Sequence, residues 1–176
     1  DVYRNDNDGK VYFLIKKDQL EKEFIYFAHI LDGIVEAGTW RGNYLDNGII
    51  QFNKYFNQIR IDRVNTAYVF DETNPLSKSK NANISNSLID SVKIEKKSES
   101  EDKFLIDVTS LLLSESLSKI TVAPYKENPK DGFKIGSISK NKSSINAVLN
   151  YPENTDFEIN FVFSNPSNKP IENQDS

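Results

Sequence analysis

The sequence predicts an all-β protein: an antiparallel β-sandwich or open barrel of about nine to ten strands with one or two short helices. Three observations support this prediction. Apolar residues recur at every second position in many short segments, which is the period of a strand with one buried face. Turn-forming Asn, Asp and Gly separate these segments. Segments with helical spacing are few and short.

The alternating segments run along most of the chain. Residues 10–17 place Val11, Phe13 and Ile15 on one face, which should face the core. The other segments with the same pattern are residues 24–30, 58–64, 90–97, 103–108, 133–138, 143–150 and 156–164. Within them, the apolar faces consist of Ile59 and Ile61, Val92 and Ile94, Phe104, Ile106 and Val108, and Phe157, Ile159, Phe161 and Phe163.

Two stretches contain residues that favour turns. Residues 5–10, NDNDGK, precede the first long strand. Asn47–Gly48 lies between Leu45 and Ile49 and predicts a hairpin, because a type I′ turn needs positive φ at both central residues.

Helices are expected at two places only. Residues 16–24 predict a single turn, with Asp18 as N-cap and Glu21 three residues later. Residues 108–120 predict one short helix capped by Thr109 or Ser110. Residues 71–87 are polar and predict a long loop.

Length and composition indicate a single domain over residues 1–165, followed by a linker or frayed tail over 166–176. The net charge of −4 is mild and basic residues are interleaved with acidic ones, which disfavours a nucleic-acid partner. The sequence contains no apolar run long enough to span a membrane. The start at Asp1 without a signal peptide fits a processed or excised piece.

The sequence contains few candidate catalytic or metal-binding residues. His29 is the only histidine, there is no cysteine, and a zinc site built from one histidine would need carboxylates for its other ligands. His29 shares a strand face with Ile25 and Phe27 and is expected to be partly buried; a role as general base or metal ligand is the alternative. Residues 4–15 fail as a calcium loop, since Arg4 and Ile15 occupy ligand positions.

Motifs for nucleophilic catalysis and phosphate binding are also missing from the sequence, which lacks G-x-S-x-G, G-x-x-x-x-G-K-[ST] and G-x-G-x-x-G. The acidic residues lie mostly in charge-mixed runs, as on a solvated surface. We therefore expect no catalytic residue, no metal ligand and no cofactor in this chain.

The most site-like segment is EAGTWRGNYLDNG, residues 36–48, which carries the only tryptophan. Trp40, Arg41 and Tyr44 are candidate ligand-binding residues for a sugar or a peptide, because aromatic faces and a guanidinium suit both. The alternative is that Trp40 and Tyr44 pack the hairpin against the core.

Four stretches resemble the N-terminal domain of unknown function found in large bacterial zinc-dependent, metzincin-like metallopeptidases. They are residues 11–30, VYFLIKKDQLEKEFIYFAHI, residues 59–72, IRIDRVNTAYVFDE, residues 104–116, FLIDVTSLLLSES, and residues 143–164, SSINAVLNYPENTDFEINFVFS. The last stretch matches the family's pattern at Ile145, Val148, Tyr151, Pro152 and Asn154. The resemblance covers about residues 10–165.

This resemblance implies a non-catalytic accessory domain of an exported zinc metallopeptidase. The chain would be secreted, periplasmic or outer-membrane-associated, and its partner would be the downstream peptidase domain, which holds the zinc. Its role would be to pack on or regulate that domain, or to present substrate. None of the family's HExxHxxGxxH zinc motif is present here, so no catalytic residue carries over. A carbohydrate-binding β-sandwich and a ligand-free structural or cell-surface domain remain open as alternatives.

Overall fold

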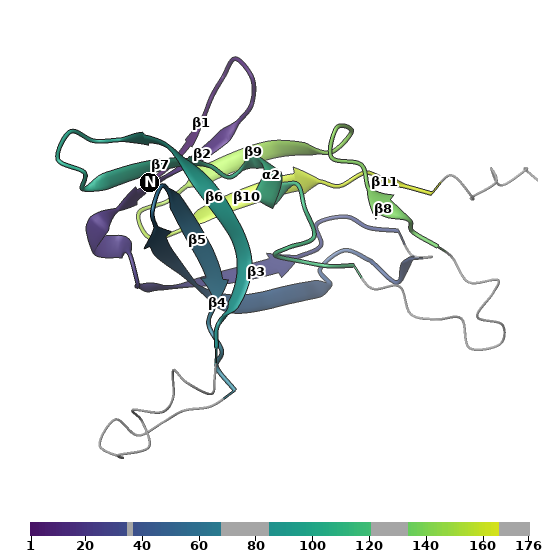
Figure 1. The fold of residues 1–176 in the computed structure, drawn as a ribbon. Coiled ribbons are helices and arrows are strands. Elements are labelled where there is room, and N and C mark those ends of the chain that lie inside the picture. Colours follow the sequence, from purple (N-terminus) through teal and green to yellow (C-terminus); the bar gives the residue numbers. More distant parts are fainter. Residues whose placement is uncertain (35–36, 68–84, 121–133, 166–176) are drawn as a thin grey trace, which may run out of the picture.

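A computed structural model describes residues 1–34, 37–67, 85–120 and 134–165. The architecture is antiparallel β, as the sequence predicts, with eleven strands in the described residues. The first seven strands are β1 (Val2–Arg4), β2 (Val11–Lys16), β3 (Glu23–His29), β4 (Tyr44–Tyr55), β5 (Gln58–Arg63), β6 (Ser87–Lys97) and β7 (Lys103–Asp107). They form one curled sheet in the order β1-β2-β7-β6-β5-β4-β3 (Figure 1).

The remaining strands form two small sheets. β9 (Ser144–Asn150) pairs with β10 (Thr155–Asn160), and β8 (Ser137–Ile138) pairs with β11 (Phe163–Ser164). Two short helices complete the described elements: the 3-10 helix η1 (Lys17–Gln19) and the α-helix α2 (Thr109–Leu112).

The core lies between the inner face of the large sheet and the elements that cover it. β9, β10 and α2 lie across the curl of that sheet in Figure 1. The ring centroids of Phe13 on β2 and Phe157 on β10 are 5.9 Å apart, so the two sheets are in direct contact. The buried cluster consists of Val11, Ile15, Phe52, Ile59, Ile61, Ile94, Phe104, Ile106, Val108, Leu111, Leu112 and Ile145. The period-two pattern therefore predicted the inward faces of β2, β5 and β7 correctly.

The hairpin expected at Asn47–Gly48 is wrong, because β4 runs straight through both residues. The turn instead occupies Phe56 and Asn57, between the paired residues Tyr55 and Gln58, and Phe56 takes the positive φ of +49°. Gly48 serves a different purpose. A Cβ there would lie 2.7 Å from Tyr26 Cε1, so the glycine allows the cross-strand tyrosine to approach the backbone of β4.

The short helices occur where expected, but their caps differ. η1 has Lys16 as its N-cap, with the Lys16 N–H donating to Gln19 Oε1, whereas Glu21 lies beyond the helix at φ +61°. α2 is capped by Val108, and Thr109 is its first residue. Thr109 Oγ1 accepts a hydrogen bond from the Val11 N–H, which ties the helix to β2.

The strand expected over residues 156–164 is divided. β10 ends at Asn160, and the chain then crosses to the third sheet as β11. The turn at residues 5–10 is confirmed, with the Lys10 N–H donating to Asp8 Oδ1 and Gly9 at φ +71°. The loop expected at 71–87 falls almost wholly outside the described residues, and the tail over 166–176 falls entirely outside them.

Candidate functional site

The outer face of β3 exposes large apolar side chains. Ile25 and Phe27 are 84% and 62% exposed, and His29 on the same face is also exposed. Tyr44, at the start of β4, is 52% exposed, and its ring centroid lies 5.2 Å from that of Phe27. The Phe27 ring is also 5.7 Å from the His29 ring. We call these four residues the aromatic face.

A local irregularity in the strand pairing completes this cluster. Ala28 pairs with Asp46, but His29 pairs with Tyr44, so one extra residue of β4 is accommodated at this point. The bulge turns Tyr44 to the same face as His29, because side chains of directly paired residues project from the same side of a sheet. The expectation that His29 is partly buried is wrong, since the face it shares with Ile25 and Phe27 is not covered by the described part of the chain.

The three sequence-predicted ligand residues are only partly brought together. Trp40 and Arg41 lie in the turn that leads into β4, where the Asn43 N–H donates to the Trp40 carbonyl (3.0 Å). Trp40 is 54% exposed, and Arg41 is exposed as well. Tyr44 contacts the Phe27 ring, and the aromatic contacts within the described ranges do not join it to Trp40. Neither Trp40 nor Tyr44 belongs to the core, so they do not pack the segment against it.

The segment before β4 is held in place by a buried threonine. Thr39 Oγ1 accepts a hydrogen bond from the Ile34 N–H and donates one to the Ile34 carbonyl, both at 2.9 Å. The Gly42 N–H donates to the Ile30 carbonyl (2.8 Å), which brings the two ends of the segment together. These contacts fix the position from which Trp40 projects, next to the end of β3.

On the opposite face of β3, a polar cluster joins three strands. Tyr26 Oη on β3 donates to Asp46 Oδ2 on β4 (3.0 Å), and Arg63 Nη2 on β5 donates to the same carboxylate oxygen (2.7 Å). Arg63 Nη2 also donates to Tyr26 Oη and to the Asn47 carbonyl (2.8 Å). The guanidinium carbon lies 5.3 Å from the centre of the Tyr26 ring, which adds a cation–π contact.

These contacts shift the ionisation of each member. Burial, together with the hydrogen bond to Asp46, raises the pKa of Tyr26 to about 12. Burial alone would raise the pKa of Asp46, but hydrogen bonds from Arg63 and Tyr26 outweigh it and hold that pKa below its ordinary value. The hydrogen bond to Asp46 raises the pKa of Arg63. At neutral pH the cluster is therefore a neutral phenol bridged to an ion pair, which anchors β3 to β4 and β5.

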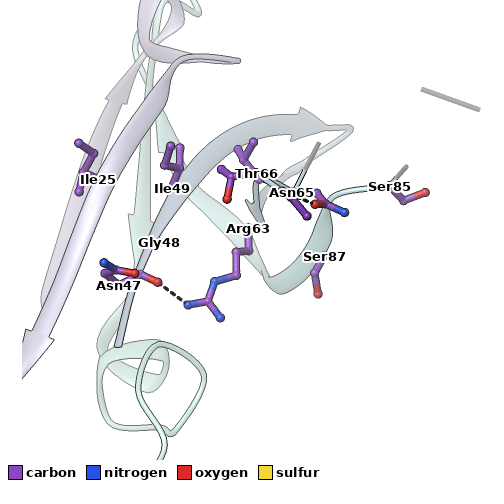
Figure 2. A pocket seen from close by; sticks show the side chains of 11 residues that line it. Ile25, Asn47, Gly48, Ile49, Arg63, Asn65, Thr66, Ser85 and Ser87 are labelled. Carbon is purple, nitrogen blue, oxygen red and sulfur yellow. Dashed lines mark hydrogen bonds between the residues drawn. The ribbon is translucent and has the colours of Figure 1, made fainter. Parts of the chain in front are cut away.

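An open groove of about 630 Å³ lies beside the aromatic face and shares Ile25 with it. Ile25, Ile49 and Val64 supply its apolar lining. Figure 2 shows Arg63 reaching from β5 towards Asn47, with Asn65 and Ser87 near the other end. The hydrogen bonds of Arg63 are all donated by Nη2, to Tyr26 Oη, Asp46 Oδ2 and the Asn47 carbonyl. The groove combines apolar and polar lining residues and extends the exposed surface of the aromatic face through Ile25.

One feature of the sequence indicates the aromatic face, although the alternation of apolar residues alone does not reveal it. In FIYFAH, both alternating sets are apolar or aromatic: Phe24, Tyr26 and Ala28 on one face, and Ile25 and Phe27 on the other. Strands with apolar residues on both faces are typical of sheets that are covered on both sides. Here the inner set packs towards the core, with the Phe24 and Phe52 ring centroids 5.3 Å apart, while the outer set is exposed.

The described residues contain neither a metal-binding cluster nor a helix suited to cross a membrane. They include no group of three or more His, Asp or Glu side chains arranged to hold a metal ion. None of their helices is long and apolar enough to cross a membrane.

Comparisons with known proteins place the chain in a family. Neither the curated proteins nor the solved structures give a significant match. A family model does match, over residues 42–175, which is more than half of the chain and includes every strand from β4 onwards. The chain therefore belongs to the family described as Domain of unknown function (DUF5117).

Proposed function

We propose that this chain is a non-catalytic accessory domain of an exported bacterial zinc metallopeptidase, and that it docks onto the peptidase domain through the aromatic face. The docking proposal is based on one observation, namely that Ile25, Phe27 and Tyr44 are exposed in one contiguous cluster. Exposed apolar patches of this kind mark protein interaction sites. A secreted, periplasmic or outer-membrane-associated location belongs to the same proposal.

The identity of the partner rests on the resemblance of four stretches of the sequence to the metallopeptidase accessory domain. The zinc belongs to the peptidase domain in this proposal. The residues here do not fit a zinc site, since the sequence has one histidine and no cysteine, and the described residues offer no three-ligand cluster. The contribution of this chain is therefore binding: it holds the peptidase domain, limits access to it, or presents a substrate segment.

The first test is the sequence of the gene beyond the codon for Ser176. The proposal requires a downstream HExxHxxGxxH motif in the same open reading frame. An open reading frame that lacks any HExxH-type motif would overturn the metallopeptidase assignment, whatever surface the domain uses.

The second test measures binding between this chain and the peptidase domain by calorimetry. Phe27→Ser should weaken binding by about tenfold or more, because an aromatic side chain that becomes buried on binding commonly contributes much of the binding free energy. Phe56→Ser is the matched control, since Phe56 is 79% exposed but lies at the β4–β5 turn. Equal effects of the two substitutions would contradict docking through the aromatic face.

The exposure of Trp40 and Tyr44 supports carbohydrate binding as a second candidate function. Sugars stack on exposed aromatic faces, and Arg41, which follows Trp40 in the sequence, offers hydrogen-bond donors. A glycan array probed with the wild type should then give a signal that Trp40→Ala removes. Tyr151→Ala should retain the signal, because Tyr151 is an exposed aromatic residue in the turn between β9 and β10. The absence of any signal from the wild type would end this candidate.

A further inference from the structure

β3 is the last strand of the seven-stranded sheet, and the described residues pair with one of its sides only. Among the described residues, its only strand partner is β4. The hydrogen bonds of the described residues supply no partner for the backbone groups on its other side. A free edge of this kind is a template for another strand.

The sequence of β3 does not protect this edge. Natural edge strands are commonly blocked by lysine, proline, a bulge or short length. β3 is seven residues long, contains neither lysine nor proline, and pairs regularly with β4 from Glu23 to Ala28. Its outward-facing residues include Ile25 and Phe27, both strongly exposed. These properties are typical of a strand whose free edge pairs with another strand.

The pairing with β4 fixes which residues of β3 offer backbone groups to the free side. The Val64 N–H donates to the Ile49 carbonyl (2.8 Å), so the backbone groups of Ile49 point towards β5. Ile25 is paired with Ile49 and therefore points its own N–H and C=O away from β4. Since the direction alternates along a strand, the backbone groups of Glu23, Phe27 and His29 share this orientation.

We propose that this edge pairs with β3 of a second copy of the chain, antiparallel and centred on Tyr26. All seven residues of β3 then overlap, and the backbone groups that point to the free side meet one another. Glu23 lies opposite His29 of the other copy, and Ile25 lies opposite Phe27. A carboxylate across from an imidazole and an aliphatic chain across from an aromatic ring are favourable cross-strand pairs.

All seven residues of the strand are paired only in this register. A shift by two residues in either direction leaves two residues of each copy unpaired. It also places Ile25 opposite Ile25 or Phe27 opposite Phe27, and it separates Glu23 from His29. The centred arrangement has a two-fold axis normal to the sheet, which is the symmetry of most protein dimers. The pairing uses the backbone groups at the edge of β3 and brings the aromatic faces of both copies onto the same side of the combined sheet. Because docking would use that face and dimerisation uses the edge, the two proposals are independent.

Sedimentation equilibrium tests the proposal on the chain as it stands. The wild type should show a concentration-dependent monomer–dimer equilibrium. Ile25→Pro removes the N–H that faces the second copy and no hydrogen bond to β4, so it should abolish the dimer. Ile25→Ala is the control, because it shortens the same side chain but keeps the N–H, and it should retain a measurable dimer. A wild type that remains monomeric up to its solubility limit would overturn the proposal.

A charge exchange tests the register. Glu23 and His29 are both exposed, so substitutions there leave the fold intact, which thermal melts would verify. Glu23→Lys should weaken dimerisation by about tenfold, since both symmetric pairs lose their acid. The double variant Glu23→Lys with His29→Glu places opposite charges across from each other in the centred register and should recover the dimer. If the double variant is weaker than Glu23→Lys alone, the centred pairing is wrong.

Discussion

β1 and β3 lie at opposite edges of the same sheet, and their edges differ in length and in cover. β1 has three residues and is held from the side by polar contacts with β9: Arg4 Nη1 donates to the Asn146 carbonyl (3.0 Å), and Asn150 Nδ2 donates to the Val2 carbonyl (3.1 Å). β3 has seven residues, and within the described part of the chain it is paired on one side only. The described residues thus cover one edge with side chains and leave the other edge without a partner.

This difference shows how the two edges depend on the rest of the fold. Removing the contacts of β1 would affect a short strand far from the aromatic face. The strand pairing and the side-chain hydrogen bonds of β3 in the described residues, in contrast, involve β4 and the polar cluster of Tyr26, Asp46 and Arg63. Substitutions in that cluster should therefore loosen β3 selectively.

The largest effect is expected from Gly48→Val. A Cβ at this position would lie 2.7 Å from Tyr26 Cε1 and 2.9 Å from Arg63 Nε, so both side chains must move and their hydrogen bonds to Asp46 are strained. We expect the free energy of unfolding to fall by about 2 kcal/mol. Hydrogen exchange should accelerate in β3 more than in β1. Asn47→Val, on the exposed face of the same strand, is the control, and equal stabilities of the two variants would contradict the close packing over Gly48.

A smaller loss is expected from Arg63→Met, which leaves the carboxylate of Asp46 with Tyr26 as its remaining side-chain donor. Loss of charge-assisted hydrogen bonds at a half-exposed site should lower the free energy of unfolding by about 1 kcal/mol, measured by urea denaturation. Arg60→Met on the same strand is the matched control. Arg60 Nη2 is 3.9 Å from Asp62 Oδ1, and the guanidinium carbon is 5.8 Å from the centre of the exposed Tyr55 ring. Both contacts are weak, so their removal should change stability by less than about 0.5 kcal/mol.

Alkaline pH should weaken the same cluster without any substitution. The pKa of Tyr26 is about 12 in the folded protein against 10.0 for an unperturbed tyrosine, so folding favours the protonated phenol. The resulting stabilisation is complete below pH 10 and is lost as the pH rises towards 12. Tyr26→Phe should flatten this part of the pH–stability curve. An unchanged slope in Tyr26→Phe would show that the raised pKa of Tyr26, which burial and the hydrogen bond to Asp46 cause, contributes nothing there.

The acidic part of the pH–stability curve tests the contribution of Asp46. Its pKa is lowered in the folded state, so it stabilises the protein above pH 3.8, its ordinary value, and this contribution disappears as the pH falls through the folded-state pKa. Asp46→Asn should remove that acid dependence. The same substitution should leave the amide exchange of β1 unchanged, because the Asp46 contacts join β3, β4 and β5 only.

The inner face of the large sheet could be predicted from the sequence because its strands alternate cleanly. Ile59 and Ile61 on β5, and Phe104 and Ile106 on β7, are separated by polar or half-exposed residues and are all buried. The pattern carries that information because one face of each strand meets the core and the other does not. Register and strand order do not follow from it, since a period of two is the same for every pairing partner.

The aromatic face and the polar cluster were not predicted, and the reasons are physical. Asn47–Gly48 is a strong turn signal locally, but the packing of Tyr26 over Gly48 overrides it. His29 was expected to be partly buried because its neighbours Ile25 and Phe27 are apolar, and apolar neighbours do not reveal whether any other element covers them. Trp40 and Arg41 remain predicted ligand residues, and their exposure is compatible with that role.

The smallest effect is expected at the closed edge. Arg4→Ala removes the hydrogen bond to the Asn146 carbonyl and should lower the free energy of unfolding by about 0.5 kcal/mol, because the contact is exposed to water. Hydrogen exchange should increase in β1 and in the adjoining part of β9, while β3 stays unchanged. If Arg4→Ala also increased exchange in β3, the two edges would be coupled through the sheet. The open edge could then not be attributed to the residues of β3 and the cluster beneath it.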